Sequence, residues 1–354
     1  MPNRKRILSN QPWCSTWGVQ VTRGGLVESF HHVAACAMDA DQNVIFAAGD
    51  IDVPVFLRST AKPFIAATAI AAGARERFGL EPREIAVMAA SHTGQAFHVD
   101  AVRSILSKIG MDEGALQCGT HEPYNAQAAK DLRDAGIAPS ALHNNCSGKH
   151  AGILALCTII GADPATYLEV SNPAQQRILA TCARASGQRV EDFGLGVDGC
   201  GIPVYATPLR NAALSFVRLA TLRGLTDADA DALRIVREAM VAHPEYVSGT
   251  NEFDTRLMQV AAGSLVCKGG AEGVHGSAFV QAGVGLVCKV LDGASRGRAP
   301  AVLDAVRQLG LLHAQQLTEL ADFEHPIVYN RAGRAVGEVR PASTVAIEKA
   351  STSI

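Results

Sequence analysis

A serine and a lysine three residues apart are the first side chains whose spacing suggests catalysis. They are Ser59 and Lys62, in the segment from Arg58 to Pro63. A helix that begins near Ser59 carries both on one face, and Pro63 then falls in the first turn, where a missing N–H has no intrahelical partner to lose. At the positive end of a helix dipole a lysine loses its proton more readily and can accept the proton of a hydroxyl. The pattern predicts an activated nucleophile, although a helix-capping serine before a surface lysine has the same spacing.

A second polar segment, Ala89 to Gly94, closes a helical stretch that begins after Pro82. Its small and polar side chains, with Ser91 and His92 at the centre, predict a loop that lines a cavity. The alternative is a helix that ends at Gly94, with His92 as a structural histidine.

A third segment places a lysine where an apolar run gives way to glycines, from Val266 to Gly273. Because Gly269 and Gly270 have no side chains, a substrate can lie against their backbone, and Lys268 can face the same cavity. An exposed hairpin with a solvated lysine is the alternative.

Two cysteine segments have the donor atoms of a metal site. Cys146 and Lys149 stand one turn apart where a helix is expected to begin, and the dipole there lowers the pKa of a thiol and disfavours an ammonium. The polar turn from Val197 to Pro203 adds Cys200. Sulfur and nitrogen ligands together indicate zinc, although lysine is an unusual ligand and no Cys-x-x-Cys pair supports the site. Ordinary buried cysteines are the alternative.

Strand-like patterns occur at both ends of the chain and helical periodicity occurs between them. The early strands are a short run to Thr22, His32 to Met38, and Val44 to Ala48, and the late ones are Ser264 to Lys268, Gly276 to Gln281, and Val284 to Leu291. The helices include one with Val102, Ile105, Leu106 and Ile109 on one face, then Ala151 to Ile160, Pro173 to Ala185, Asp229 to Ala242, and finally Pro300 to Leu309. Few βαβ alternations are present, so this order predicts an α+β fold with an antiparallel sheet assembled from both chain ends around a helical insertion.

Composition narrows the class of protein. The 354 residues are 48% hydrophobic and 19% charged with a formal net charge of -2, as in a globular protein with no basic surface for nucleic acid. We find no apolar stretch long enough for a membrane span or a signal peptide, so a cytoplasmic protein is expected. The nine cysteines are odd in number and widely spread, which predicts reduced thiols.

Taken together, these segments resemble the zinc-containing L-asparaginases of the rhizobial type, also called class 3. The specific part is Cys-Ser-Gly-Lys-His from Cys146 to His150, paired with Asp-Gly-Cys from Asp198 to Cys200. The resemblance extends from Thr22 through most of the chain. That family is similar in fold to serine β-lactamases and penicillin-binding proteins, and this agrees with the order of strands and helices.

The resemblance implies a role for each residue that matches by position. It implies two serine-lysine pairs, Ser59 with Lys62 and Ser91 with Lys268. It implies one zinc ion per chain, substrate-orienting or structural, held by Cys146, Lys149 and Cys200 with water. The substrate-binding residues that we expect are Arg58, His92, Asp198 and Cys200. The expected domains are a sheet domain (1–60 and 260–354) and a mostly helical domain (61–259), with the pocket at their junction.

The implied activity is hydrolysis of L-asparagine to L-aspartate and ammonia through a lysine-activated serine and an acyl-enzyme, in a homodimer. Lys268-Gly269-Gly270 replaces the Lys-Thr-Gly of penicillin-recognising enzymes, which argues against β-lactam turnover. A glutaminase or another serine amidohydrolase of the same fold is the alternative enzyme. A non-catalytic module with a purely structural cysteine site is the alternative from another class.

Overall fold

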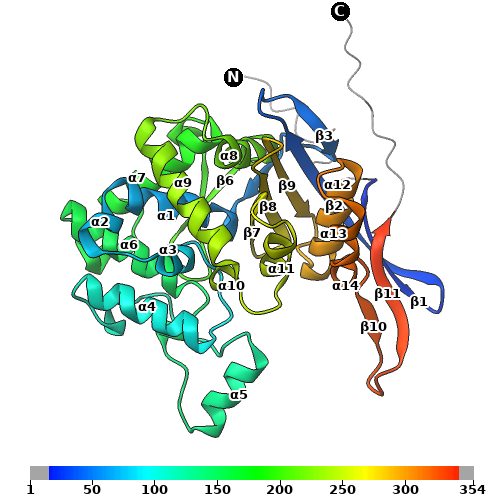
Figure 1. Cartoon of the computed structure of the whole chain (residues 1–354), viewed down its shortest axis with the longest axis horizontal. Coiled ribbons are helices and arrows are strands. Elements are labelled where there is room, and N and C mark those ends of the chain that lie inside the picture. The colour runs from blue at the N-terminus through cyan, green and yellow to red at the C-terminus, as the bar shows by residue number, and fades with distance from the viewer. Residues whose placement is uncertain (1–15, 343–354) are drawn as a thin grey trace, which may run out of the picture.

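The computed structural model describes residues 16–342, and Cys14 lies outside them. Both ends of this range contribute to one antiparallel sheet, whose strand order is β10-β11-β1-β2-β9-β8-β7, with β3 paired to β2 (Figure 1). The strands are β1 (Gly18–Arg23), β2 (Leu26–Met38), β3 (Val44–Ala48), β7 (Leu265–Gly269), β8 (Val274–Phe279), β9 (Val284–Val290), β10 (Ile327–Tyr329) and β11 (Ala335–Ala342). The expected fold class is therefore confirmed.

The pairing of β2 with β9 joins the early strands to the late ones. Its antiparallel register sets Ala35 opposite Cys288 and Ala37 opposite Leu286. The β1–β2 hairpin turns through Gly24 and Gly25, which both have positive φ and so use the backbone freedom of glycine.

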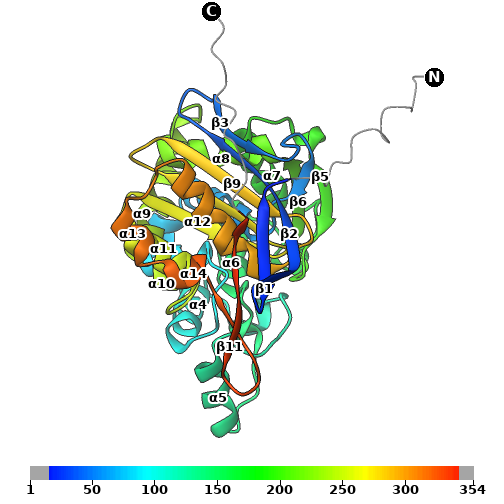
Figure 2. The same cartoon turned by 90° about the vertical axis from the view of Figure 1, so that its right-hand side faces the viewer.

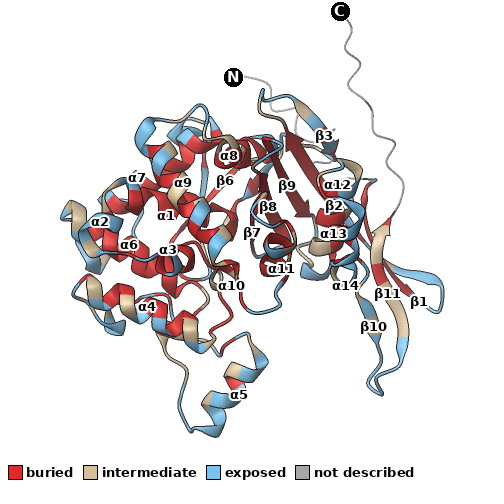
Figure 3. Cartoon of the chain, in the orientation of Figure 1, coloured by how far each residue is buried: buried red, intermediate tan, exposed pale blue. Residues whose placement is uncertain are grey.

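Helices cover both faces of the central strands. On one face α8 (Leu209–Thr221) lies so close that a β-carbon at Gly285 would be 2.3 Å from the Val217 nitrogen. Val290 points to the opposite face of β9, where a β-carbon added at Gly297, just before α12 (Arg298–Gln308), would lie 3.4 Å from it. Every residue of β7, β8 and β9 is consequently buried (Figure 3).

The middle of the chain is mostly helical, as expected, and forms a cluster beside the sheet. Helix α1 packs against α6, α7 and α9, and α5 projects away from the body in two perpendicular views (Figures 1 and 2). The remaining helices are α1 (Lys62–Ala71), α2 (Ala74–Phe78), α3 (Pro82–Met88), α4 (Ala96–Lys108), α5 (Ala126–Asp134), α6 (Ser147–Ile160), α7 (Pro173–Ser186), α9 (Asp227–Ala242), α10 (Pro244–Val247), α11 (Phe253–Val260), α13 (Ala314–Thr318) and α14 (Ala321–Glu324).

Two sheet elements were not predicted. One is a small sheet of order β4-β6-β5, made of β4 (Pro54–Phe56), β5 (Gly194–Val197) and β6 (Pro203–Pro208). It matters for the site because the turn that contains Cys200 connects β5 to β6. The other is the hairpin of β10 and β11, whose first strand is only three residues long and largely exposed, so its sequence has little strand pattern.

Other expectations meet the structure only in part. Between residues 16 and 342, the eight cysteines are buried and free, as predicted for reduced thiols. None of the helices in that range is long and apolar enough to cross a membrane. The division into domains at residues 60 and 260 stays a prediction.

Candidate active site

A sharp turn presents Ser59 at the start of α1. Residues Arg58–Ala61 form a 3-10 turn, and Lys62 and Pro63 then open the α-helix. Arg58 has a φ of 48°, a left-handed conformation that non-glycine residues adopt at a cost of about 1–3 kcal/mol. Such local strain is common where a side chain must be aimed at a substrate.

The side chain of Lys62 is buried and contacts groups from two distant segments. Its Nζ donates to the Ala90 carbonyl oxygen at 2.6 Å, to Ser91 Oγ at 2.9 Å and to Cys146 Sγ at 3.2 Å. Burial lowers the pKa of Lys62. The expected partner of Lys62 was Ser59, and that of Ser91 was Lys268. Among the described residues neither pair is joined by a direct hydrogen bond, and Lys62 is the lysine that contacts Ser91.

Backbone hydrogen bonds fix the loop that carries Ser91 and His92. The Ser91 N–H donates to the Val247 carbonyl, and the His92 N–H donates to the carbonyl of Asn145, next to Cys146. The His92 ring is fully buried, and burial lowers its pKa well below the usual range.

Both ring nitrogens of His92 are already engaged. Nδ1 accepts from the Gly94 N–H, so Nε2 carries the proton and lies 2.8 Å from Ser147 Oγ. These contacts tie the loop to α6, and the expected substrate-binding role of His92 stays a prediction.

The three expected metal ligands converge. Cys146 is the residue before α6, Lys149 lies in its first turn, and Lys149 Nζ donates to Cys200 Sγ at 2.8 Å. The neighbouring Cys200 thiol lowers the pKa of Cys146, and Cys146 together with burial raises the pKa of Cys200. Burial opposes the charge on Lys149, but the two sulfurs outweigh burial and raise its pKa.

This donor set fits a zinc ion. Two sulfurs and one amine nitrogen face one another in a buried space, and the sulfurs are atoms that zinc prefers in proteins, whereas the amine is an unusual ligand. His150, the next residue along α6, donates or accepts a hydrogen bond of 2.7 Å between Nδ1 and the Tyr167 hydroxyl. Its Nε2 is buried without a hydrogen-bond partner in the described part of the chain.

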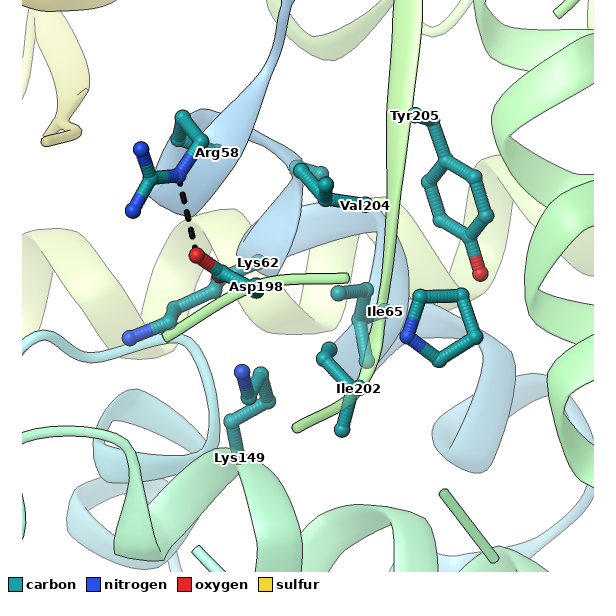
Figure 4. A pocket seen from close by; sticks show the side chains of 10 residues that line it. Arg58, Lys62, Ile65, Lys149, Asp198, Ile202, Val204 and Tyr205 are labelled. Carbon is teal, nitrogen blue, oxygen red and sulfur yellow. Dashed lines mark hydrogen bonds and ion pairs between the residues drawn. The ribbon is translucent and has the colours of Figure 1, made fainter. Parts of the chain in front are cut away.

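A polar pocket opens beside these groups (Figure 4). Arg58 Nε and Asp198 Oδ1 form an ion pair of 2.9 Å, and the amines of Lys62 and Lys149 point into the same space. Burial disfavours the Asp198 carboxylate, but Lys149, the Gly199 N–H and Arg58 outweigh it and lower the pKa of Asp198. The apolar side of this pocket is made of Ala61, Ile65, Ile202, Pro203, Val204 and Tyr205.

Lys268 reaches the site from the sheet and is fully buried, so the exposed hairpin can be dismissed. A β-carbon added at Gly270 would lie 3.2 Å from the Ser59 nitrogen, so this end of β7 lies against the turn that presents Ser59. Lys268 Nζ donates to the Gly269 carbonyl at 2.6 Å and lies 3.8 Å from Asp254 Oδ2. No sequence motif pointed to Asp254, because a single acidic residue on an amphipathic helix has no signal of its own.

Comparison with curated sequences gave no match. Among solved structures, two of a protein named Mglu align with TM-scores of 0.37 and 16% identity, over 79% of this chain and 67% or 61% of theirs. Mglu in its L-glutamate binding form aligns with a TM-score of 0.36 and 16% identity, over 78% of this chain and 58% of its own. The chain thus spans about two thirds or less of these structures.

The comparison with families gave one match that covers most of the chain. A family described as L-asparaginase II matches residues 19–341. That range includes the turn at Ser59, the loop at Ser91, the cysteine segments and Lys268. The chain therefore belongs to the L-asparaginase II family.

Proposed function

We propose that the chain hydrolyses the side-chain amide of L-asparagine, giving L-aspartate and ammonia through an acyl-enzyme on a serine. The observation that carries the proposal is the position of Lys62. Its amine contacts Ser91 Oγ at 2.9 Å, and it follows Ser59 by one helical turn beside the pocket. Membership in the L-asparaginase II family supports an amide as the bond that is cleaved.

The charges that line the pocket suit an α-amino acid. Such a substrate has a carboxylate and an ammonium on one carbon. Arg58 offers a positive charge for the carboxylate, and Asp198 offers a negative charge for the ammonium. In the structure these two side chains neutralise each other at 2.9 Å, and a bound amino acid would replace that pair with two. With both charges held in this way, the side-chain amide would extend toward Lys62, which lines the pocket and contacts Ser91.

The chemistry is a double displacement with Ser59 as the first choice of nucleophile and Ser91 as the second. The serine Oγ attacks the amide carbon and its proton passes to a lysine amine. The C–N bond then breaks, and the leaving nitrogen takes a proton and departs as ammonia. Water cleaves the ester by the same route and returns the proton to the serine. The Ser59 N–H donates no hydrogen bond to a described backbone group, so it is available to the oxyanion.

Cys146, Lys149 and Cys200 are the residues that would hold zinc. When bound, the metal would supply a fixed positive charge next to Asp198 and so help to orient the substrate. Asp198 and Cys200 share the short turn between β5 and β6, and this turn would place the substrate-binding carboxylate relative to the metal ligands.

Ammonia release from L-asparagine tests the proposal. Ser59→Ala should reduce kcat by about 1,000-fold or more, and Lys62→Met by about 100-fold or more. Ser215→Ala is the matched control, because Ser215 is a buried serine of α8 that donates to the Ala212 carbonyl outside the site. Retained turnover in Ser59→Ala with loss in Ser91→Ala would move the nucleophile to Ser91. Retained turnover in both would contradict a serine mechanism.

Substrate preference and assembly need separate measurements. L-Glutamine at equal concentration separates an asparaginase from a glutaminase, and faster ammonia release from glutamine would favour the second enzyme. The homodimer is retained as a proposal, and light scattering of the purified chain measures it directly.

A further inference from the structure

The open edge of β7 carries a closed ring of polar contacts. Strand β7 ends the large sheet, so one of its edges has no neighbouring strand among the described residues. At that edge the Gly269 N–H donates to Asp254 Oδ2 at 2.5 Å, and the Gly269 carbonyl accepts from Lys268 Nζ at 2.6 Å. Lys268 Nζ and Asp254 Oδ2 lie 3.8 Å apart, which closes the ring.

Helix α11 supplies the carboxylate of this ring. Asp254 lies in the first turn of α11 and is fully buried, and α11 packs along β7. A peptide group at a sheet edge normally faces water or another strand. Here the Asp254 carboxylate accepts a hydrogen bond from the Gly269 N–H, and the Lys268 ammonium donates one to the Gly269 carbonyl. Both backbone groups are therefore hydrogen-bonded, and their two side-chain partners carry opposite charges that also contact each other.

Several other charged or titratable groups face this pair. Arg298 of α12 donates to the Gly270 carbonyl at 3.4 Å, and His275 Nε2 of β8 lies 3.3 Å from Asp254 Oδ1. Cys267 donates its thiol to the Asp254 carbonyl. The positive charge of Lys62, across the site, lowers the pKa of Lys268.

These neighbours argue against a metal ion. Asp254, Cys267 and His275 bring three donor atoms within 4.8 Å of one another, a spacing that a cation can use. Burial raises the pKa of the Cys267 thiol, and this thiol already donates to the Asp254 carbonyl. A further cation would also meet Lys268 and Arg298, so the single carboxylate already has its positive partners.

We propose that Asp254 is the positioning residue of Lys268: it anchors the last peptide of β7 and holds the lysine as a fixed cation at the edge of the pocket. This inference rests on the proposed function for its role in the reaction. Lys62, by comparison, contacts a carbonyl, a hydroxyl and a thiol but has no carboxylate within 4.0 Å among the described residues. The two lysines therefore have different roles. Lys268 supplies a positive charge, and Lys62 exchanges a proton with a serine.

Direct titration of Lys268 tests the contact without any substrate. The chain has eight lysines, so a protein labelled with carbon-13 at the lysine ε-carbon gives a small set of NMR signals. The signal that disappears in Lys268→Met is the signal of Lys268. Asp254→Asn should lower the pKa of Lys268 by about one unit or more, because the ammonium loses its nearest negative charge. Asp229→Asn removes another buried carboxylate, paired with Arg184, and should leave Lys268 unchanged. An unchanged pKa in folded Asp254→Asn would overturn the proposal.

A double-mutant cycle covers the case in which Asp254→Asn folds poorly. If Asp254 and Lys268 are partners, Asp254→Asn/Lys268→Met should lose less stability in urea than the two single variants added together. Additive losses would overturn the pairing. Both measurements stand apart from catalysis, so a wild type that releases no ammonia from L-asparagine would refute the proposed function and leave this result intact.

Discussion

At the scale of single residues, the two buried lysines of the site differ in the partners that they contact. Lys268 lies beside the Asp254 carboxylate, whereas Lys62 contacts uncharged acceptors and a thiol. Burial lowers the pKa of Lys268 to about 8, with Asp254 opposing part of that effect. If Lys268 acts as a cation, its charge should be lost within an accessible range of pH.

The expected pH dependence follows from the sign of that charge. The ammonium is present below its pKa and absent above it, so kcat/KM for L-asparagine should fall as pH rises through about 8. Lys268→Arg is the matched variant, because a guanidinium keeps its proton throughout and should remove this alkaline limb even where the rate is reduced. Steady-state kinetics between about pH 6 and pH 10 measure both enzymes. A limb that persists in Lys268→Arg would assign the titration to another group.

The cysteines allow a second prediction at this scale, since Cys146 and Cys200 lie beside each other and beside the Lys149 amine. Cys200→Ser should abolish bound zinc, because it removes a sulfur that contacts Lys149. Cys182→Ser should keep a full complement, since burial raises the pKa of Cys182 to about 12 and this thiol stays protonated within α7. Elemental analysis of the purified proteins gives zinc per chain. Equal metal contents in the two variants would contradict the site.

At the scale of elements, close contact joins α8 to strands β8 and β9 of the sheet. Gly276 and Gly285 have no side chains at this contact, and a β-carbon would lie 2.1 Å from the Phe216 ring or 2.3 Å from the Val217 nitrogen. We expect Gly285→Ala to lower the free energy of unfolding by about 2 kcal/mol or more, because the obstacle is backbone that cannot move aside.

Gly161→Ala is the control for that change. Gly161 ends α6 with a φ of 69° and a β-carbon there meets no atom within 4 Å, so only the left-handed backbone is penalised, by about 1 kcal/mol. Urea unfolding at an unchanged m-value compares the two variants. If Gly161→Ala loses as much stability as Gly285→Ala, the close packing of α8 is not what makes Gly285 necessary.

The elements themselves were largely predictable because their residues repeat with clear periods. The pattern for Pro173 to Ala185 became α7, which begins after Asn172, and that asparagine accepts the Ala174 N–H as a helix cap. The pattern for Val284 to Leu291 became β9, which ends one residue earlier. The small sheet was missed because β4 and β5 are three and four residues long, too short for a period to be seen.

At the scale of the whole molecule, the site depends on contacts between segments that are distant in sequence. The motifs predicted that Ser59, Ser91, Cys146, Cys200 and Lys268 belong together, and the structure brings their segments to one place. Periodicity could not predict which lysine contacts Ser91, because that contact joins residues 29 positions apart in the chain. Nor could it predict Asp254, whose importance arises only from the packing of α11 against the edge of β7.

The same distance between segments makes metal binding a property of the whole fold. Cys146 and Lys149 begin α6 in the helical part, whereas Cys200 lies in the turn of the small sheet. A metal ion bound to all three would link these segments in the folded state and lose that link on unfolding. Free metal at about 100 times its dissociation constant should then stabilise the fold by about 3 kcal/mol.

Removal of the metal therefore has an expected result that separates the alternatives. A chelator should lower the melting temperature of the wild type, and added zinc should restore it, because the ion binds the folded chain alone. In Cys200→Ser, which lacks one ligand, the chelator should have no effect. Thermal unfolding followed together with ammonia release shows whether the ion also serves catalysis. If added zinc restores the melting temperature but no amide is hydrolysed, the chain is better described as a structural module. Its cysteines would then stabilise the fold, and its serines would have no catalytic role. Restored melting with restored turnover would tie the metal ligands to the pocket that Arg58 and Asp198 line.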